Sequence, residues 1–267
     1  MQAEVSTHSW DPVGYEVLVG PQVQWAEDLI NTLSLSTNYH ILDVGCGTGR
    51  ITAKLASLVP NGSVIGIDNS IPMIEYARAK YPKVTYPNLQ FIVMDARNIS
   101  LPCKFNIVYS NATLHWFKEQ SDFLRSAWQV LIPGGKLHAC LAAKHNAQEI
   151  FLAIRKIIRK YPWRTWFRKF RKPFFLPTAI EYSRLLIEAN FKILKCEQLI
   201  ETMFFPDLES LANWIRKLWL PYIQQVPIEY RDPFIKEIID AYASIAHSNE
   251  KGAPIQTSRL VIIAQKP

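Results

Sequence analysis

The sequence contains few cysteines and no long uncharged apolar stretch. Its cysteines show neither the paired spacing of a metal site nor a disulfide framework, and each lies in or beside a predicted core element. We therefore expect buried thiols in a reducing compartment at Cys46, Cys103, Cys140 and Cys196. No apolar run reaches the length that spans a bilayer, and residues 1–10 lack an export signal, so a cytoplasmic protein is predicted.

Internal repeats and low-complexity linkers are also absent from the sequence. Because 267 residues with 49% hydrophobic content can bury a full core, we expect one α/β domain over residues 1–267. His138 and His145 have no partners at metal-ligand spacing, and no metal site is predicted.

The most specific pattern is HILDVGCGTGR at residues 40–50. A short apolar run with β character is broken by three glycines and followed by a helix-compatible segment over residues 50–58. The predicted order is thus a strand, a tight turn and a helix. Glycines let the backbone approach a ligand without a Cβ in the way, and a helix start offers unpaired N–H groups. The turn is therefore predicted to bind the polar end of a ligand.

A second apolar run, residues 64–67, ends in Asp68. This run is expected to lie beside the first strand, which would place the Asp68 carboxylate to accept hydrogen bonds from ribose hydroxyls. A glycine turn between strand and helix, with the acid at this distance, is more specific than glycines alone. The dinucleotide pattern needs a small residue where Arg50 stands, so a small zwitterionic end group fits better than a diphosphate.

The spacing of Asp43, Gly45, Gly47 and Gly49 resembles the first motif of the class I S-adenosylmethionine-dependent methyltransferases. Residues 68–78, 91–96, 110–116 and 131–139 resemble further motifs of that family in the same order. The resemblance implies S-adenosylmethionine as cofactor, with its methionine part on the turn, its ribose on Asp68 and its adenine amino group on Asp95. The implied cofactor contacts are Asp43, Gly45, Cys46, Gly47, Gly49, Asp68, Asn69, Met73, Asp95, Ala96 and Asn111.

The likeness extends over nearly the whole chain. WDPVGY at residues 10–15 and the segment 211–243 resemble the amino-terminal signature and carboxyl-terminal helices of the trans-aconitate methyltransferase-like group. Apolar runs that alternate with helical patterns predict a doubly wound, mostly parallel seven-stranded sheet with a helical cap. The resemblance implies that this is the Rossmann-like methyltransferase fold. The last strand follows a long helical insertion and is expected to be antiparallel.

The expected strands lie near residues 40–45, 63–68, 89–94, 105–110, 136–142, 192–198 and 259–265. Around them we expect an N-terminal helical lid over residues 1–38, a cofactor-binding core over 39–143, and helical cap insertions over 144–180 and 203–255.

His115 is the histidine of the motif that follows the fourth strand. It is predicted to position the substrate, with a general base and simple packing as alternatives. Trp116 is expected to shield the methyl-transfer cavity, or else to belong to the core. Trp10 and Tyr15 are expected to close the lid over the cofactor, or else to pack as ordinary aromatics of a terminal helix.

The basic residues are concentrated in one segment. Residues 155–172 carry nine Lys or Arg and no acid, so the other 21 basic residues face all 23 acidic ones. Aromatic residues recur with helical spacing after Pro162, which predicts an amphipathic helix over residues 163–172. This helix is expected to be a cap helix with a solvated basic face, a membrane-surface helix, or an attractor for anionic substrate or a carrier protein.

The sequence thus predicts methyl transfer to a small anionic or apolar acceptor, first of all O-methylation of a carboxylate such as trans-aconitate. Alternatives are O-methylation of a carrier-bound carboxylate, and C- or N-methylation of an apolar natural product or isoprenoid, which Phe204, Phe205, Trp214 and Trp219 would accommodate. A cofactor-binding regulatory or membrane-surface protein without turnover is the alternative from another class. Nucleic acid is not an expected partner, because no recognised binding module is present.

Overall fold

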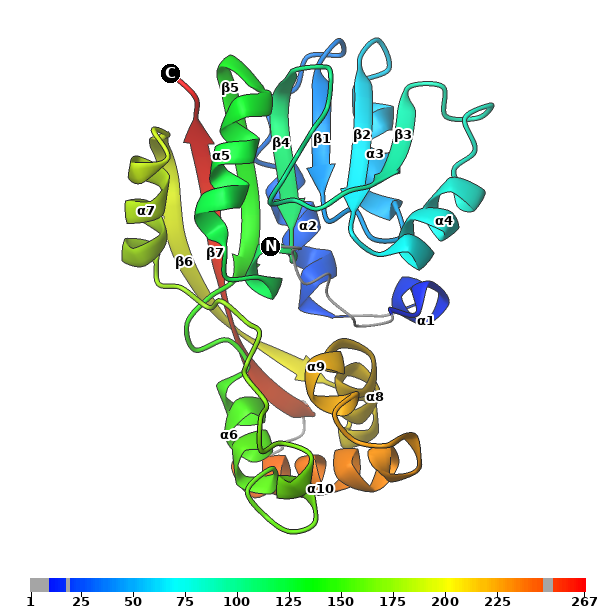
Figure 1. Cartoon of the computed structure of the whole chain (residues 1–267), viewed down its shortest axis with the longest axis vertical. Helices are drawn as coiled ribbons and strands as arrows, with labels where there is room; N and C mark the ends of the chain where they lie inside the picture. Colours follow the sequence, from blue (N-terminus) through cyan, green and yellow to red (C-terminus); the bar gives the residue numbers. More distant parts are fainter. Residues whose placement is uncertain (1–9, 18–19, 247–251) are drawn as a thin grey trace.

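The computed structural model describes residues 10–17, 20–246 and 252–267. Seven strands form one sheet in the order β3-β2-β1-β4-β5-β7-β6 (Figure 1). Neighbouring strands from β3 to β5 pair in parallel, whereas β7 pairs antiparallel with both β5 and β6. The strands are β1 (His40–Val44), β2 (Ser63–Asp68), β3 (Leu89–Val93), β4 (Phe105–Asn111), β5 (Leu131–Ala142), β6 (Lys192–Phe205) and β7 (Ala253–Gln265). The predicted fold is confirmed, including its antiparallel last strand.

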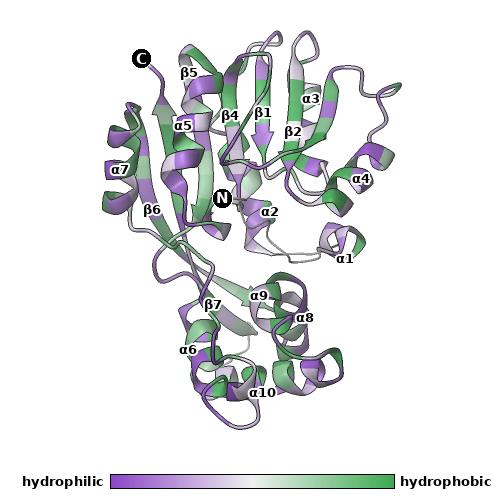
Figure 2. Cartoon of the chain, viewed as in Figure 1, coloured by the Kyte–Doolittle hydropathy of each residue, from purple (hydrophilic) through white to green (hydrophobic). Residues whose placement is uncertain are grey.

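Helices cover both faces of this sheet, as the side chains of β1 show. Ile41 packs in the layer of α2 (Pro21–Ile30), α3 (Arg50–Leu58) and α4 (Ile71–Lys80). Leu42 and Val44 pack in the opposite layer, with α5 (Gln120–Val130) and α7 (Ala179–Glu188). Strands buried on both sides read as continuous apolar runs, and Figure 2 shows this as green bands along the central strands.

The amino-terminal segment divides between two places. α2 buries Trp25, Ala26 and Leu29 against the sheet, so it belongs to the core layer although it lies within the predicted lid. α1 (Pro12–Glu16) lies apart from the sheet, between α4 and the cap (Figure 1). Glu16 of α1 forms an ion pair with Lys80 at the end of α4.

The cap has a hydrophobic core of its own. It contains α6 (Gln148–Ile157), α8 (Leu208–Leu218), α9 (Leu220–Ile223) and α10 (Arg231–Ala243), with the 3-10 turns η2 (Trp163–Thr165) and η3 (Ile228–Tyr230). β6 and β7 run into it as a long antiparallel pair, from Lys192 opposite Gln265 to Phe205 opposite Ala253. The predicted strands 192–198 and 259–265 were therefore too short, as was 136–142 for β5. Residues 199–205 carry only Glu201 and Thr202 as polar residues, and pairing with β7 continues this strand into the cap.

The predicted amphipathic helix over residues 163–172 is wrong. Beyond α6, this part of the chain forms the single turn η2 and further turns, with i to i+3 hydrogen bonds such as Trp166 N–H to the Trp163 carbonyl. Trp163 and Phe167 are still buried, with ring centres 5.0 and 5.5 Å from that of Phe234. Like charges four residues apart disfavour a helix, and packing on α10 directs the chain instead.

The prediction of a buried thiol is wrong for one of the four cysteines. Cys46 and Cys140 are buried and Cys196 is half-buried, but Cys103 is exposed, because residues 101–104 form surface bends before β4. No helix in the described part of the chain is long and apolar enough to cross a membrane.

Candidate active site

The glycine turn lies between β1 and α3. Gly45 has a φ of 75°, and a Cβ there would lie 2.1 Å from the Thr113 hydroxyl oxygen, so the turn passes close to the loop after β4. Gly47 has a φ of 53°, and the nearest atom to a Cβ there would be a ring carbon of Tyr15 at 4.0 Å. Packing against Thr113 thus leaves no space beside Gly45, whereas the space beside Gly47 is open to a ligand.

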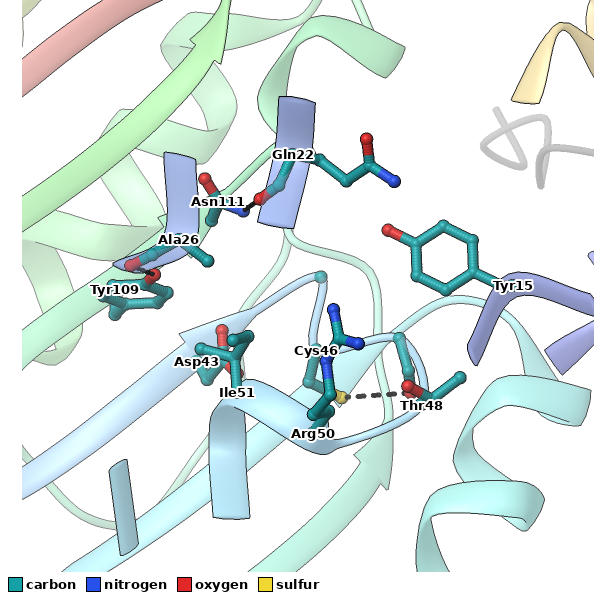
Figure 3. Close-up of a pocket in the computed structure, with 12 residues that line it drawn as sticks. Tyr15, Gln22, Ala26, Asp43, Cys46, Thr48, Arg50, Ile51, Tyr109 and Asn111 are labelled. Carbon is teal, nitrogen blue, oxygen red and sulfur yellow. Dashed lines mark hydrogen bonds between the residues drawn. The ribbon is translucent and has the colours of Figure 1, made fainter. Parts of the chain in front are cut away.

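The turn forms one wall of a cavity of about 490 Å³, here called the glycine-turn cavity (Figure 3). Other walls come from α1, α2 and the ends of β1 and β4. The lining residues are Tyr15, Gln22, Ala26, Asp43, Gly45, Cys46, Gly47, Thr48, Arg50, Ile51, Tyr109 and Asn111.

Two acceptor groups of this cavity fit the ammonium group of a bound methionine moiety. Asn111 donates from Nδ2 to the Gln22 carbonyl at 2.9 Å, and its buried Oδ1 has no partner among the described residues. Asp43 is buried and accepts a 2.7 Å hydrogen bond from the Thr52 hydroxyl. Burial raises the pKa of Asp43 to about 7, and a bound cation would favour its ionised form.

Asp68 supports the turn from behind. Its Oδ2 accepts the Gly47 N–H at 3.0 Å and its Oδ1 accepts the Ser70 N–H at 2.9 Å. Burial raises the pKa of Asp68, and these backbone donors counteract that rise. Its side chain does not line the glycine-turn cavity.

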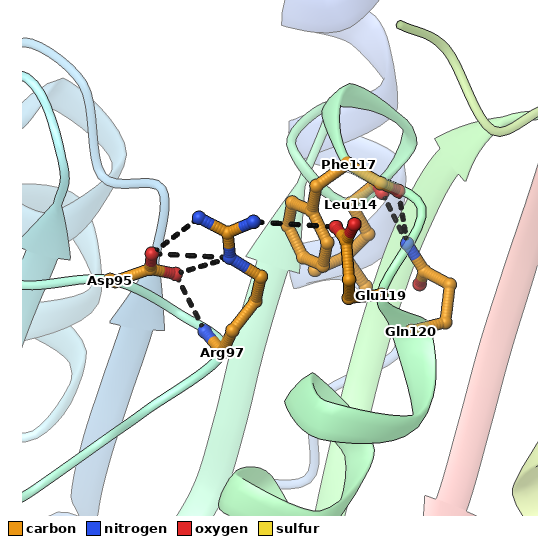
Figure 4. A network of polar contacts seen from close by, with 6 residues as sticks. All are labelled: Asp95, Arg97, Leu114, Phe117, Glu119 and Gln120. Carbon is orange, nitrogen blue, oxygen red and sulfur yellow. Dashed lines mark hydrogen bonds and ion pairs between the residues drawn. The ribbon is translucent and has the colours of Figure 1, made fainter. Parts of the chain in front are cut away.

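Asp95 lies in a network on the loop after β3 (Figure 4). Arg97 donates to both of its carboxylate oxygens, with the shortest contact 2.7 Å from Nη2 to Oδ2, and also reaches Glu119 at 3.3 Å. This pairing lowers the pKa of Asp95 against the effect of its partial burial. Arg97 therefore engages both carboxylate oxygens of Asp95, the residue to which the family resemblance assigns the adenine amino group.

The structure brings together only part of the predicted cofactor set. Asp43, Gly45, Cys46, Gly47 and Asn111 line the glycine-turn cavity. The others lie off its wall: Gly49 precedes α3, Asn69 is exposed, Met73 is buried in α4, Asp68 ends β2, and Asp95 and Ala96 follow β3.

A second cavity of about 690 Å³, here called the aromatic cavity, lies between the core and the cap. It shares Tyr15 and Gln22 with the glycine-turn cavity, so the two adjoin. The four predicted substrate and lid residues, Trp10, Tyr15, His115 and Trp116, all line it. The remaining walls are Pro21, Gln22, Trp25, Ala112, Ala142, Asn146, Phe151, Phe174, Leu176, Trp214, Leu218 and Trp219.

His115 is held in one tautomer. It lies on the turn η1 (Leu114–Trp116), and its Nδ1 accepts the backbone N–H of Ala142 at 3.3 Å. Burial lowers the pKa of His115 to about 3, so the imidazole is neutral at pH 7. A neutral ring whose Nδ1 accepts a hydrogen bond carries its proton on Nε2. His115 is thus a hydrogen-bond donor at Nε2.

Aromatic rings enclose the cavity on the other sides. Trp116 lies edge-on to Trp10 at 5.1 Å between ring centres and contacts Phe174 at 5.0 Å. Sequence reasoning missed Gln22, Asn146, Phe151 and Phe174, because they come from α2, the cap and their connections, where no motif marks them. The aromatic content of the cap was the available signal, and Trp214 and Trp219 do line the cavity.

Comparison with known proteins agrees with this geometry. A family model described as "Methyltransferase domain" matches residues 41–135. The putative methyltransferase 235L of Invertebrate iridescent virus 6 is 31% identical over 239 residues, which span 90% of this chain and 87% of that protein. The chain belongs to the class I S-adenosylmethionine-dependent methyltransferases.

Within this family the chain is similar to the trans-aconitate 2-methyltransferase of Acidovorax sp. (strain JS42), with 26% identity over 272 residues, 97% of this chain and 99% of that one. In fold it is similar to Haemonchus contortus phosphoethanolamine N-methyltransferase 2, solved with S-adenosylhomocysteine. The TM-score is 0.61 at 16% identity, over 96% of this chain and 57% of that one. The methyltransferase uses S-adenosylmethionine as its donor, as the sequence predicts.

Replacing Gly47 tests whether the turn is open for the cofactor. In Gly47→Ala the new Cβ would point toward Tyr15 in the glycine-turn cavity, and we expect S-adenosylmethionine to bind about tenfold more weakly or worse. Gly134→Ala is the matched control, because Gly134 also has a positive φ, 78°, with nothing within 4 Å. Both variants should lose about 1 kcal/mol of stability. Equal cofactor affinity by titration calorimetry in both would contradict the assignment.

Removing the Asp68 carboxylate tests its predicted ribose contact. Asp68→Ala should weaken S-adenosylmethionine binding by about 1–3 kcal/mol, through lost charge-assisted hydrogen bonds and a loosened Gly47 N–H. Asp122→Ala, which removes only an exposed pair with Arg125, is the control. Wild-type affinity in a folded Asp68→Ala protein would exclude Asp68 from the site.

Proposed function

We propose that this methyltransferase methylates the carboxylate of a small acceptor bound in the aromatic cavity. The observation that carries this proposal is that no described residue lining this cavity is suited to take up a proton at neutral pH. Among the lining residues, only His115 and Tyr15 titrate, and His115 presents a protonated Nε2. Burial raises the pKa of Tyr15 to about 12, so its phenol also stays protonated.

The lack of a base favours some acceptors over others. A carboxylate is already ionised at pH 7, whereas a hydroxyl or an ammonium group must lose a proton before or during attack. Bound S-adenosylmethionine supplies an activated methyl group, and transfer to a carboxylate moves no proton. His115 would then donate from Nε2 to one carboxylate oxygen and leave the other free to attack, so we assign it to positioning and not to base catalysis.

On the donor side, Asp43 and Asn111 would hold the ammonium group, and the backbone around Gly47 would contact the rest of the methionine moiety. Asp68 remains our proposed ribose contact. Asp95 remains the proposed adenine contact. Binding of adenine would require Arg97 to break some of its hydrogen bonds to the Asp95 carboxylate. Because the two cavities meet at Tyr15 and Gln22, both reactants would be held close together with water excluded by the aromatic walls.

The aromatic walls support a second candidate, methylation at an alkene carbon or an amine of an apolar molecule. The faces of Trp and Phe rings attract cations. Attack of an alkene on the methyl group of S-adenosylmethionine creates a carbocation, which these rings would stabilise. Such products are stable to mild base, whereas methyl esters are hydrolysed by it, so product lability separates the two candidates.

The test is transfer of labelled methyl from saturating S-adenosylmethionine to a panel of carboxylic acids across pH 4.5 to 8.5. We expect base-labile product, and a kcat/KM that is flat above pH 6 and falls only as the acceptor carboxyl protonates near its usual pKa of about 4–5. Since the pKa of His115 is lowered to about 3, no step from this residue should appear near pH 6.5. A base-stable product, or a rising limb near pH 6.5 that His115→Gln abolishes, would refute carboxylate methylation without a base.

The basic segment 155–172 provides a further element of the proposal. None of its nine cations forms an ion pair within the described part of the chain. Lys172 places its ammonium 4.3 Å from the centre of the Phe151 ring, on the wall of the aromatic cavity. We propose that this surface attracts an anionic acceptor, free or on a carrier, toward the cavity.

Neutralising exposed cations tests that attraction. Replacing Arg164, Arg168, Lys169 and Arg171 by Gln should raise KM for carboxylic acids several-fold at low salt, with kcat unchanged and the difference lost at high salt. The control replaces the same number of exposed cations on the core, Lys83, Lys104, Arg125 and Lys192. The same salt dependence of KM in both variants would refute a local role for the segment.

A further inference from the structure

The walls of the aromatic cavity point to one class of acceptor. Resting on the proposed carboxylate methylation, we propose that the acceptor is an apolar monocarboxylic acid, with a single charged head and a hydrocarbon body, and not a polycarboxylate. The charge and the polarity of the lining residues support this inference.

The wall carries no formal charge. Among the described residues that line the aromatic cavity there is no Asp, Glu, Lys or Arg. Its surface comes mainly from indole and phenyl rings with Leu176 and Leu218. A tricarboxylate would bury two additional anionic groups there without a cationic partner, which opposes binding strongly. A hydrocarbon chain would instead replace water against these rings with a gain from apolar burial.

The few polar groups suffice for one carboxylate. His115 offers its Nε2–H, as its Nδ1 is taken by the Ala142 N–H. Asn146 accepts the Ser258 N–H at Oδ1, 3.0 Å away, which leaves its amide NH₂ as a donor. Both residues are fixed by backbone beside the carboxyl end of β5, since the Asn146 N–H also bonds the Ala143 carbonyl. The wall thus offers two neutral donors, which suffice to hold a single carboxylate.

The cations lie outside this wall. Lys172 is not among the lining residues, although its ammonium lies 4.3 Å from the centre of the Phe151 ring, and all the basic residues of the segment 155–172 are exposed. They can attract an anion over a distance but do not pair with a second or third carboxylate inside.

The deciding experiment measures binding apart from turnover. Enzyme loaded with S-adenosylhomocysteine is titrated with decanoic acid, its diacid counterpart decanedioic acid, and trans-aconitic acid, and tryptophan fluorescence reports occupancy of the cavity. We expect decanoate to bind at least about tenfold more tightly than either polycarboxylate, with affinity rising from hexanoate to decanoate. Equal or tighter binding of decanedioate or trans-aconitate would overturn the proposal.

Turnover with the same acids separates this inference from the proposed function. Decanoate that binds tightly but yields no methyl ester would leave the ligand class standing and refute carboxylate methylation. Ester formed from trans-aconitate with a higher kcat/KM than from decanoate would confirm carboxylate methylation and refute the apolar class.

Two variants test the residues that carry the argument. His115→Phe removes the neutral donor and should weaken decanoate binding about tenfold, whereas His115→Gln keeps an N–H donor and should restore most of it. Phe174→Arg places a cation on the wall, so decanedioate should gain affinity relative to decanoate. His145→Asn, a change at an exposed histidine outside the cavity, is the control. Unchanged decanoate affinity in His115→Phe, or an unchanged ratio in Phe174→Arg, would contradict the inference.

Discussion

The carboxylate of Asp68 ties together the three elements on which the donor side of the site depends. It stands at the end of β2, accepts the Gly47 N–H from the turn after β1, and accepts the Ser70 N–H at the start of α4. The glycines of the turn are intrinsically adaptable, and the charge-assisted bond from the Gly47 N–H restricts the turn, while the bond from Ser70 fixes the start of α4 to the same carboxylate. The geometry that opens Gly47 to the cavity is thus maintained by the residue the sequence assigns to the ribose.

The acceptor side depends on a different constraint, the long antiparallel pairing of β6 with β7. This pairing carries the cap away from the sheet while keeping it in one register with the core. The walls of the aromatic cavity combine core residues such as Trp25 and Ala142 with cap residues such as Trp214. A cap attached through a loop alone would leave the relative position of these walls far less defined.

The sequence predicts the regular part of this structure well, because its signals are local. The strands expected near residues 40–45, 63–68, 89–94 and 105–110 agree within a residue with β1 to β4, since doubly covered parallel strands are continuous apolar runs between turns. The predicted amphipathic helix over residues 163–172 shows the opposite case. Its aromatic spacing satisfies a helix pattern, but burial of Trp163 and Phe167 on α10 decides its path.

Site chemistry was less predictable because it depends on contacts between distant residues. His115 donates from Nε2 because its Nδ1 accepts the backbone N–H of Ala142. Asp95 is engaged because the side chain of Arg97 turns toward it, and no sequence motif predicts that direction. The glycine motif identifies the donor site because the positive φ angles of this turn favour glycine, so the residue type predicts the backbone geometry. No sequence motif marks the acceptor site, since aromatic residues from any elements that the cap brings together can form its wall.

An uncharged acceptor cavity also suits the proposed chemistry. When a carboxylate attacks a sulfonium, a negative and a positive charge disappear together, so the transition state is less charged than the reactants. A buried Lys or Arg beside the carboxylate would stabilise the reactant anion more than the transition state and would slow the reaction. A neutral donor such as His115, whose pKa burial lowers to about 3, orients the carboxylate without adding that charge. The cations on the surface of the cap would attract the anionic acceptor, whereas only neutral groups surround it where methyl transfer takes place.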